Sequence, residues 1–298
     1  MLDNKKSLKS VLALGYFDSV HKGHQEVIKS ARILADKEGA NLVICTFDGN
    51  LKSFFSEENT KVVYTKAERE EIYYSLGADE VYFAPVTAEF LSMGKREFLE
   101  HLNQKFNVLG YVCGKDYKFG KNGSGNANDL IDFANERSQK AVIIEIVPIN
   151  EQKASSTLVK GLLEAGKIEE ANEVLGRSYS VSGKVMRDRS VGKKLGFPTI
   201  NIYPQNEKQS LKEGVYAGHI FIEDRKYKAI INYGSRPTFG LDERVIEAHI
   251  LEFDGDLYDR QVKLFFDRFI RGVIKFDNAQ MLKDRLKTDL DIVKGMNI

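Results

Sequence analysis

Two histidines stand close together in residues 14–24, a segment whose residue types suit phosphate chemistry. His21 and His24 follow an apolar run of strand length, residues 10–14. Apolar residues then recur at helical spacing from Val27 onward, so both histidines stand at or just before the first turn of an amphipathic helix. The first turn of a helix presents unpaired N–H groups and partial positive charge. We therefore expect this segment to bind a phosphate chain.

Two later segments could contribute to the same kind of site. Residues 114–125 follow a strand-like run and contain four glycines with several basic residues, so the backbone could approach a nucleotide closely. Residues 155–160 can cap and open a helix, and their hydroxyls and free N–H groups could bind phosphate, with Lys160 one turn inside. Taken alone, each pattern is also typical of a flexible loop or of an ordinary helix cap.

Length and composition limit the classes of protein to which these segments can belong. The chain has 298 residues, which suggests two domains with substantial cores. Lys and Arg number 44 against 43 for Asp and Glu, so the net charge of +1 gives no reason to expect nucleic acid or membrane binding. No apolar run approaches the length that spans a bilayer, and the N-terminus has no signal-like segment. We therefore expect a cytoplasmic protein.

The first half of the chain alternates short apolar runs with amphipathic helices, which predicts an α/β fold with a parallel sheet covered on both faces. Thr65 and Glu68 fit a capping box at the start of one helix. Ligands of such sheets bind at the carboxyl ends of the strands, where all three segments lie. The predicted strands are residues 10–14, 41–47, 80–84, 109–113 and 142–147, and the predicted helices are residues 25–38, 67–76, 95–106 and 129–138.

The second half has a different pattern. A helix over residues 168–175 links it to the first half, and a series of strand-length runs with turn signals between them follows. Such a series predicts an antiparallel six-stranded β-barrel. The predicted strands are residues 179–185, 199–202, 215–222, 227–232, 245–253 and 262–270, and a terminal helix over residues 279–293 closes the chain.

The three segments of the first half resemble motifs of one enzyme family. Gly15, Phe17 and the His-x-Gly-His spacing in residues 15–24 resemble the signature of α/β nucleotidyltransferases, in the branch that makes FAD from FMN. Residues 114–121, Gly-Lys-Asp-Tyr-Lys-Phe-Gly-Lys, resemble a FAD synthetase motif, and residues 155–160 resemble the Ser-Ser-Thr-x-Ile-Arg element that closes the site. The resemblance implies a Rossmann-like nucleotidyltransferase domain in which the catalytic residues are His21 and His24 and the nucleotide-binding residues are Gly15, Phe17, Gly114, Asp116, Ser156, Thr157 and Lys160.

Two features depart from that family pattern. Lys160 stands where the family has an arginine, and lysine keeps the charge but loses the bidentate geometry of the guanidinium. Residues 47–51, Phe-Asp-Gly-Asn-Leu, replace the usual Phe-Asp-Pro-His-Pro in a loop that the resemblance places beside the flavin pocket. An N-terminal domain that is weak, restricted to one flavin redox state or inactive in adenylyl transfer therefore stays an alternative.

The second half resembles riboflavin kinases. Residues 192–201, Gly-Lys-Lys-Leu-Gly-Phe-Pro-Thr-Ile-Asn, resemble the kinase motif that ends Gly-Phe-Pro-Thr-Ala-Asn. Thr199 and Asn201, two apart on a strand, point the same way and would offer neutral oxygens to a Mg²⁺ that keeps phosphate and water ligands. The resemblance further implies a base that takes a proton from riboflavin, Glu247, a nucleotide-binding segment, Gly183, Lys184 and Val185, and a flavin-binding residue, Arg271.

The two blocks occur in the order found in bacterial bifunctional riboflavin kinase/FMN adenylyltransferases, and this resemblance covers nearly the whole chain. It implies an FMN adenylyltransferase-like domain over residues 1–175, linker helices included, and a riboflavin kinase domain over residues 176–298. We then expect ATP as co-substrate, Mg²⁺ as cofactor, and riboflavin, FMN, FAD and ADP as the other ligands. A flavin-binding regulator without turnover is the remaining alternative, although a base beside a metal site favours an enzyme.

Overall fold

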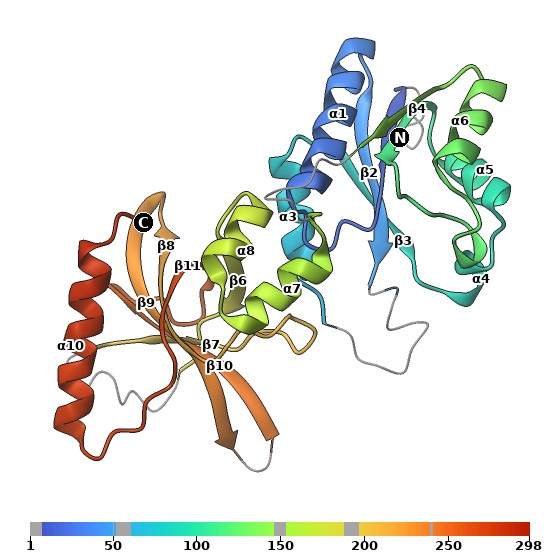
Figure 1. Cartoon of the computed structure of the whole chain (residues 1–298). Coiled ribbons are helices and arrows are strands. Elements are labelled where there is room, and N and C mark those ends of the chain that lie inside the picture. The colour runs from blue at the N-terminus through green and yellow to red at the C-terminus, as the bar shows by residue number, and fades with distance from the viewer. Residues whose placement is uncertain (1–7, 50, 52–60, 146–152, 188–196, 239–240) are drawn as a thin grey trace. The chain divides into compact units, whose positions relative to one another are not determined.

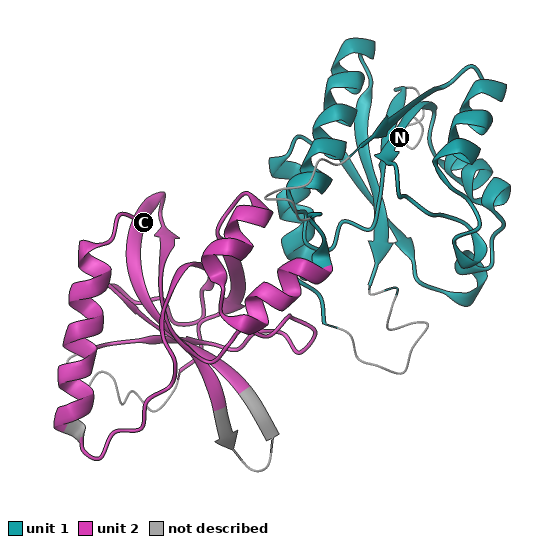
Figure 2. Cartoon of the chain, in the orientation of Figure 1, with its two compact units in different colours: residues 1–156 teal, residues 157–298 magenta. Residues whose placement is uncertain are grey.

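The computed structural model describes residues 8–49, 51, 61–145, 153–187, 197–238 and 241–298 of the chain (Figure 1). Asn50 and residues 192–196 of the kinase-like motif, on which the sequence analysis draws, lie outside the described residues. The chain folds into two compact units, residues 1–156 and residues 157–298, each with its own sheet (Figure 2).

The first unit is built on a parallel five-stranded sheet, which confirms the prediction from the alternating pattern. Its strands are β1 (Ser10–Leu14), β2 (Asn41–Asp48), β3 (Glu80–Pro85), β4 (Val108–Gly114) and β5 (Lys140–Ile144). Their order is β3-β2-β1-β4-β5, so the chain adds strands on one side of β1 and then returns to add β4 on the other. The carboxyl ends of β1 and β4 therefore form a switch point, where such sheets bind ligands.

Helices cover both faces of this sheet (Figure 1). They are α1 (Lys22–Glu38), α3 (Lys66–Ser75), α4 (Ala88–Leu91), α5 (Lys95–Lys105) and α6 (Ala127–Glu136), with a 3₁₀ turn at Lys121–Gly123. One core contains Ile28 of α1 and Tyr73 of α3. The other contains Phe98 of α5 and Leu130 of α6. Alternate residues of β1 enter both cores, so this strand is buried on its two faces.

Capping side chains determine where several of these helices begin. The Glu68 N–H donates to the Thr65 hydroxyl at 3.4 Å, and the Thr65 N–H donates to the Glu68 carboxylate at 2.9 Å, which confirms the predicted capping box of α3. Asn126 and Asp129 form the same reciprocal pair at the start of α6. His21 caps α1 through its side chain, so a residue predicted to be catalytic also fixes the start of a helix.

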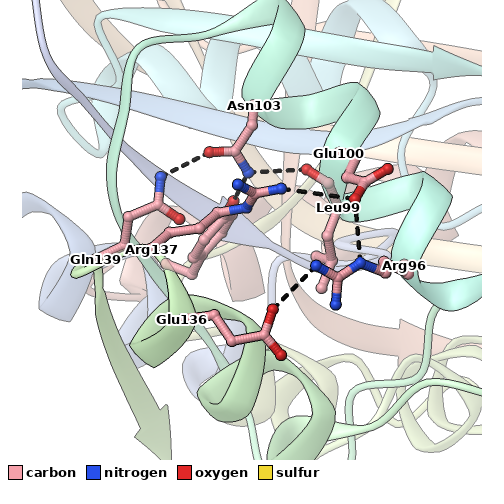
Figure 3. Close-up of polar contacts among 8 residues, drawn as sticks. Arg96, Leu99, Glu100, Asn103, Glu136, Arg137 and Gln139 are labelled. Atoms are coloured by element: carbon pink, nitrogen blue, oxygen red, sulfur yellow. Dashed lines mark hydrogen bonds and ion pairs between the residues drawn. The ribbon is translucent and has the colours of Figure 1, made fainter.

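A polar network holds α5 against α6 and the segment that leads into β5 (Figure 3). Arg96 binds Glu100 on its own helix at 3.1 Å and Glu136 of α6 at 3.0 Å. The side-chain oxygen Oδ1 of Asn103 accepts a hydrogen bond from Nε2 of Gln139 at 2.6 Å. The ion pairs are exposed, and such pairs contribute little stability each, so the network mainly fixes how these helices pack side by side.

The second unit begins within α7 (Ser156–Ala165) and continues through α8 (Ile168–Leu175). Its antiparallel sheet has six strands in the order β6-β11-β8-β9-β10-β7, which confirms the predicted architecture. The strands are β6 (Tyr179–Lys184), β7 (Ile200–Ile202), β8 (Gly214–Ile222), β9 (Arg225–Thr238), β10 (Leu241–Ile250) and β11 (Gln261–Arg271). Met186, just after the edge strand β6, pairs with Asn201 of the other edge strand, and this bridge closes the sheet into a barrel.

The terminal helix α10 (Ala279–Gly295) packs on the outer face of this barrel. Val293 of the helix lies in a small apolar core with Val215 of β8 and Ile230 of β9. Lys228 of β9 donates a hydrogen bond to the carbonyl oxygen of Lys294 at 2.9 Å, which satisfies one of the last carbonyl groups of the helix. No helix within the described ranges is long and apolar enough to cross a membrane.

Several elements differ from their predicted bounds, and for three of them the local reason is clear. β5 starts at Lys140, two residues before the predicted start, because it continues to pair with β4 there. β10 ends at Ile250 rather than at Phe253, because Glu252 adopts a positive φ of 59° and turns the chain. α4 was not predicted, since four residues are too few to show a helical period.

Candidate active sites

A cavity of about 380 Å³ opens at the switch point of the parallel sheet, at the carboxyl ends of β1 and β4. Thr157 and Lys160 follow Ser156 in α7 but belong to the second unit. The other residues that the sequence predicted for adenylyl transfer all line this cavity, although they come from three distant segments: Gly15, Phe17, His21, His24, Gly114, Asp116 and Ser156.

The loop between β1 and α1 is closely packed and strained. Gly15 has no room for a side chain, since a Cβ there would lie 2.4 Å from the ring of Phe17. Val20 has a positive φ of 47°, which is rare for a β-branched residue, and its side chain is fully buried. Strain of this kind persists only where the surrounding structure enforces it, and it is common at functional sites. Here it places His21 at the N-cap of α1.

His21 and His24 stack on each other, with ring centroids 3.7 Å apart. Nδ1 of His21 accepts a hydrogen bond from the backbone N–H of His24 at 3.2 Å, which caps α1. With Nδ1 used as an acceptor, the proton of neutral His21 lies on Nε2, and the ring keeps an N–H donor on that side. Phe17 packs edge-on against His24 at 5.1 Å. Both imidazoles are thus held at the positive end of α1.

The start of α7 is tied to the same loop. The hydroxyl oxygens of Ser19 and Ser156 lie 2.9 Å apart, and Ser19 is fully buried. Ser155 and Ser156 line the cavity together with His21. The start of α1 and Ser156, the first residue of α7, therefore border this cavity, and the start of α1 offers N–H groups and positive partial charge to an anion.

The cavity also contains a cation that the sequence analysis did not single out. Lys153 lines the cavity, and its Nζ lies 2.6 Å from Oδ2 of Asp116. This hydrogen-bonded ion pair lowers the pKa of the Asp116 carboxyl. Lys153 stands two residues before Ser155. A basic residue so close to a predicted phosphate-binding helix start is the signal that could have identified it.

A second, more apolar cavity of about 210 Å³ adjoins the first, and the two share Phe47, Leu51 and Lys118 in their linings. The rest of its lining is mostly apolar: Phe90, Leu91, Phe98, Phe119, Gly120, Asn122 and Gly123. A cavity with aromatic walls and few polar groups suits a flat apolar ring system. The first unit therefore offers adjoining sites for an anion and for such a ring.

In the second unit the strand register brings two predicted residues together. Asn201 of β7 and Glu247 of β10 are directly paired, so their side chains emerge on the same face of the sheet. Asn201 is 6% exposed, and its Oδ1 has no hydrogen-bond partner among the residues that the structure describes. A buried amide oxygen without a partner costs stability, and a cation beside it would satisfy it.

The predicted nucleotide-binding residues are Gly183 and Lys184, the last two residues of the edge strand β6, and Val185, which follows it. The backbone N–H of Met186, the next residue, donates a hydrogen bond to the backbone carbonyl oxygen of Asn201 at 2.9 Å. The segment therefore lies beside the predicted metal ligand. Lys184 forms an exposed ion pair with Asp259 at 3.0 Å, which lowers the pKa of the Asp259 carboxyl.

A cavity of about 450 Å³ lies on the other face of β7 and β10. Ile200 and Ala248, which are paired in the sheet, line it, and they alternate with Asn201 and Glu247 along the two strands. Thr199 also lines this cavity. It precedes the first residue of β7, so strand alternation does not require it to share the side of Asn201.

His249 shares a face of β10 with Glu247 and has a structural contact of its own. Its Nδ1 donates a hydrogen bond to the carbonyl oxygen of Pro198 at 2.8 Å, and its ring packs against Phe197. His249 thereby fixes the segment that leads into β7 and carries Thr199.

Arg271, predicted to bind flavin, is held by a buried carboxylate. Its guanidinium donates hydrogen bonds to Asp289 at 2.7 and 3.0 Å, and Asp289 is fully buried. Arg285 contacts the same carboxylate at 3.1 Å. This group of charges fixes α10 to β11, and removing one partner would leave a buried charge uncompensated.

Known families match both units. The family model for FAD synthetase matches residues 3–158, and the model for riboflavin kinase matches residues 175–296. The bifunctional riboflavin kinase/FMN adenylyltransferase of Listeria monocytogenes is 30% identical to this chain over 96% of it and 92% of the relative's length. The protein of that name from Bacillus subtilis is 28% identical over 97% of this chain and 92% of its own.

A solved structure also matches the whole chain. The crystal structure of a Streptococcus pneumoniae protein described as a macrolide-efflux protein has a TM-score of 0.89 and 29% sequence identity, and the match covers 99% of this chain and 98% of that one. The two family models occur in the order of the two units and together span nearly all of the sequence. The chain therefore belongs to the family of bifunctional riboflavin kinase/FMN adenylyltransferases, ATP-using enzymes of flavin biosynthesis.

Proposed function

We propose that residues 176–298 phosphorylate riboflavin with ATP and that residues 1–175 transfer AMP from a second ATP to the FMN phosphate. The observation that carries the proposal is the gathering of the predicted histidines, Asp116 and Ser156 around one cavity at the switch point. The pairing of Asn201 with Glu247 supports the kinase half. Neither step needs a covalent enzyme intermediate, because phosphoryl and nucleotidyl transfer depend on positioning and charge neutralisation.

In adenylyl transfer, an oxygen of the FMN phosphate attacks the α-phosphorus of ATP, the bond to the bridging oxygen breaks and pyrophosphate leaves. Negative charge builds on the leaving phosphates, and donors fixed in place stabilise it. His21 and His24 at the start of α1 are such donors, with the N–H groups of the same helix turn. Ser156 and Lys153 line the same cavity and would bind the phosphates as well.

The apolar cavity beside this site suits the isoalloxazine ring of FMN. Phe47 and Phe90 both line it and pack edge to face, with centroids 6.4 Å apart. Because Phe47 and Lys118 also line the phosphate cavity, a flavin ring held there would direct its phosphate toward the histidines. The aromatic walls would supply stacking and apolar contact.

In the kinase step, the primary hydroxyl of riboflavin attacks the γ-phosphorus of ATP and ADP leaves. Glu247, half-buried beside Asn201, would accept the hydroxyl proton as a general base. Asn201 and Thr199 would hold Mg²⁺, and the unpartnered buried Oδ1 of Asn201 fits that role. A bound Mg²⁺ would neutralise negative charge on the phosphates.

The remaining predicted residues of the kinase surround this pair. The nucleotide would be contacted by Gly183, Lys184 and Val185, which lie beside Asn201. The cavity that Thr199 lines has room for the adenine base of ATP. Arg271 would lie toward the flavin end, with its guanidinium oriented by Asp289.

Incubation of the protein with riboflavin, ATP and Mg²⁺, followed by chromatographic separation of the flavins, tests the proposal. FMN together with FAD is the expected result. Formation of FMN alone would support a second candidate function, a kinase whose N-terminal domain is weak, restricted to one flavin redox state or inactive. Lys160 in place of arginine and the altered residues 47–51 favour that candidate. Repeating the assay with reduced FMN distinguishes a domain restricted to one redox state of the flavin from an inactive domain. Riboflavin binding without formation of FMN or FAD would instead indicate a flavin-binding regulator.

A further inference from the structure

A line of cross-strand neighbours crosses the sheet of the second unit at the proposed kinase site. Asn201 of β7 pairs with Glu247 of β10, and Glu247 pairs with Asn232 of β9. Directly paired residues place their side chains on the same face, with Cβ atoms about 5 Å apart. The three side chains therefore follow one another across the sheet as amide, carboxylate and amide, over about 10 Å.

This face of the sheet is the one that α10 partly covers. Lys228, Ile230 and Asn232 alternate along β9 and so share a face. Lys228 binds the carbonyl oxygen of Lys294, and Ile230 packs in the apolar core with Val293, so α10 lies over both. Asn232 is exposed. Its amide therefore lies where this face becomes open to solvent, next to the proposed base.

The order of groups along this line determines what lies over Asn232 during the kinase reaction. The phosphates and their metal belong at the Asn201 end, where the buried unpartnered oxygen is. The acceptor hydroxyl must lie at Glu247 to lose its proton. The rest of the acceptor cannot extend back over the phosphates, so it continues past Glu247 toward Asn232. In riboflavin, the atoms next to the reacting hydroxyl are the other hydroxyl groups of the ribityl chain.

We propose that Asn232 recognises the hydroxyl groups of the acceptor's polyol chain, an inference that rests on the proposed kinase function. A carboxamide offers two N–H donors and an acceptor oxygen, so it can give and receive hydrogen bonds from adjacent hydroxyls. Asn232 touches the substrate away from the reacting atoms and therefore sets which alcohol is phosphorylated. Its role is distinct from proton transfer by Glu247.

The test compares two acceptors in the full-length protein and in its Asn232→Ala variant. One acceptor is riboflavin, and the other is a flavin with a 5-hydroxypentyl chain, which keeps only the terminal hydroxyl. With riboflavin the variant should lose about 5- to 10-fold in kcat/KM, the effect of one or two neutral hydrogen bonds, mainly through a higher KM. With the hydroxypentyl flavin the two proteins should agree within about twofold, and the KM for ATP should stay unchanged in both cases.

Lys226→Ala is the matched control, because Lys226 is exposed on the same face of β9, six residues before Asn232. It should leave the rates with both acceptors unchanged. An equal loss with both acceptors in Asn232→Ala would overturn the inference and make Asn232 a positioning residue for Glu247. An Asn232→Ala variant that phosphorylates riboflavin as the parent does would overturn it as well.

Binding without turnover gives a second readout. Quenching of flavin fluorescence should show weaker riboflavin binding in Asn232→Ala, by a factor similar to the change in KM, and unchanged binding of the hydroxypentyl flavin. If the parent protein binds riboflavin but phosphorylates neither acceptor, the proposed kinase function fails. The binding measurements then still test whether Asn232 contacts the polyol chain, because equal riboflavin affinity in parent and variant would reject that contact.

Discussion

The two sites of this chain are positioned in opposite ways. In the first unit the chemical groups stand on loops and helix starts beyond the ends of β1 and β4, and three distant segments supply them. In the second unit Asn201 and Glu247 stand within strands, and the hydrogen-bond register alone makes them neighbours. At a switch point the loops that follow the strands supply the site residues, so the strand register does not determine which side chains are present. In a sheet, by contrast, the register determines which residues are paired, and a shift of one residue would separate Asn201 from Glu247. The first site can therefore change by loop substitution, and residues 47–51 are one such change.

The chemical groups differ in the same way. The first cavity offers two stacked imidazoles, helix N–H groups and a lysine, all of which donate to an anion. The second site offers an amide oxygen, a hydroxyl and a carboxylate, which accept a proton or bind a cation. The difference follows the chemistry, because adenylyl transfer builds charge on a leaving group while the kinase must first activate a neutral alcohol.

Glu247→Gln should separate the two activities by the largest factor. The substitution keeps the shape of the side chain and removes the base, so the rate of riboflavin phosphorylation should fall about 10²- to 10⁴-fold. The rate of FAD formation from supplied FMN should not change, because that site lies in the other unit. Initial rates of both steps, measured by flavin chromatography, check this. Kinase turnover close to that of the parent would remove Glu247 from the role of base.

Replacing His21 and His24 together by Ala should give the converse result. Loss of both donors should lower the rate of adenylyl transfer about 10²- to 10³-fold while riboflavin phosphorylation continues. His21 also caps α1, and losing a cap costs about 1 kcal/mol, so the thermal unfolding of the variant must be measured alongside. His24→Ala alone leaves the capping side chain in place and controls for that effect. Normal FAD formation by the folded double variant would contradict the proposed site.

Asn201→Ala and Thr199→Ala test whether these two residues bind Mg²⁺. Each should raise the Mg²⁺ concentration that the kinase requires, by about tenfold for the loss of one ligand worth about 1.4 kcal/mol. Because Oδ1 of Asn201 is buried without a partner among the described residues, Asn201→Ala should not lower the unfolding temperature without Mg²⁺. Mg²⁺ with ATP should stabilise the parent more than either variant. The same Mg²⁺ dependence in all three proteins would reject the ligand role.

The sequence predicted the elements and residues whose positions depend on local patterns, and it did not predict those that distant contacts position. β1 and α8 have the predicted boundaries, because turn residues flank clear apolar patterns. The gathering of His21, Asp116 and Ser156 also followed from the sequence, since a parallel sheet brings the carboxyl ends of its strands to one edge.

The place of Thr199, just before the first residue of β7, could not be predicted in this way. Thr199 and Asn201, two residues apart, were expected to lie on one strand and point the same way, but β7 begins only at Ile200, so the alternation of the strand does not extend to Thr199. The backbone there is fixed by the hydrogen bond from His249 to Pro198, residues 51 positions apart, and no local pattern encodes such a contact. Lys153 was missed although it stands two residues before Ser155, because its contact with Asp116, 37 positions away, is not encoded in a local pattern.

The smallest expected effect concerns this lysine. Lys153→Ala removes a cation from the phosphate cavity and leaves the Asp116 carboxylate there without its partner, so the KM for ATP in FAD formation should rise about 3- to 10-fold. The unfolding temperature should barely change, because exposed ion pairs contribute little stability.

Lys115→Ala is the matched control for Lys153→Ala. It breaks an ion pair with Glu145 at 2.8 Å that is also exposed, and neither Lys115 nor Glu145 lines the cavity. The KM for ATP should therefore stay at the parent value in this variant. The difference in KM between Lys153→Ala and the parent should also shrink as the salt concentration rises, since salt screens exposed charges. Equal KM values in all three proteins would show that adenylyl transfer depends on the start of α1 and the histidines, without a contribution from Lys153.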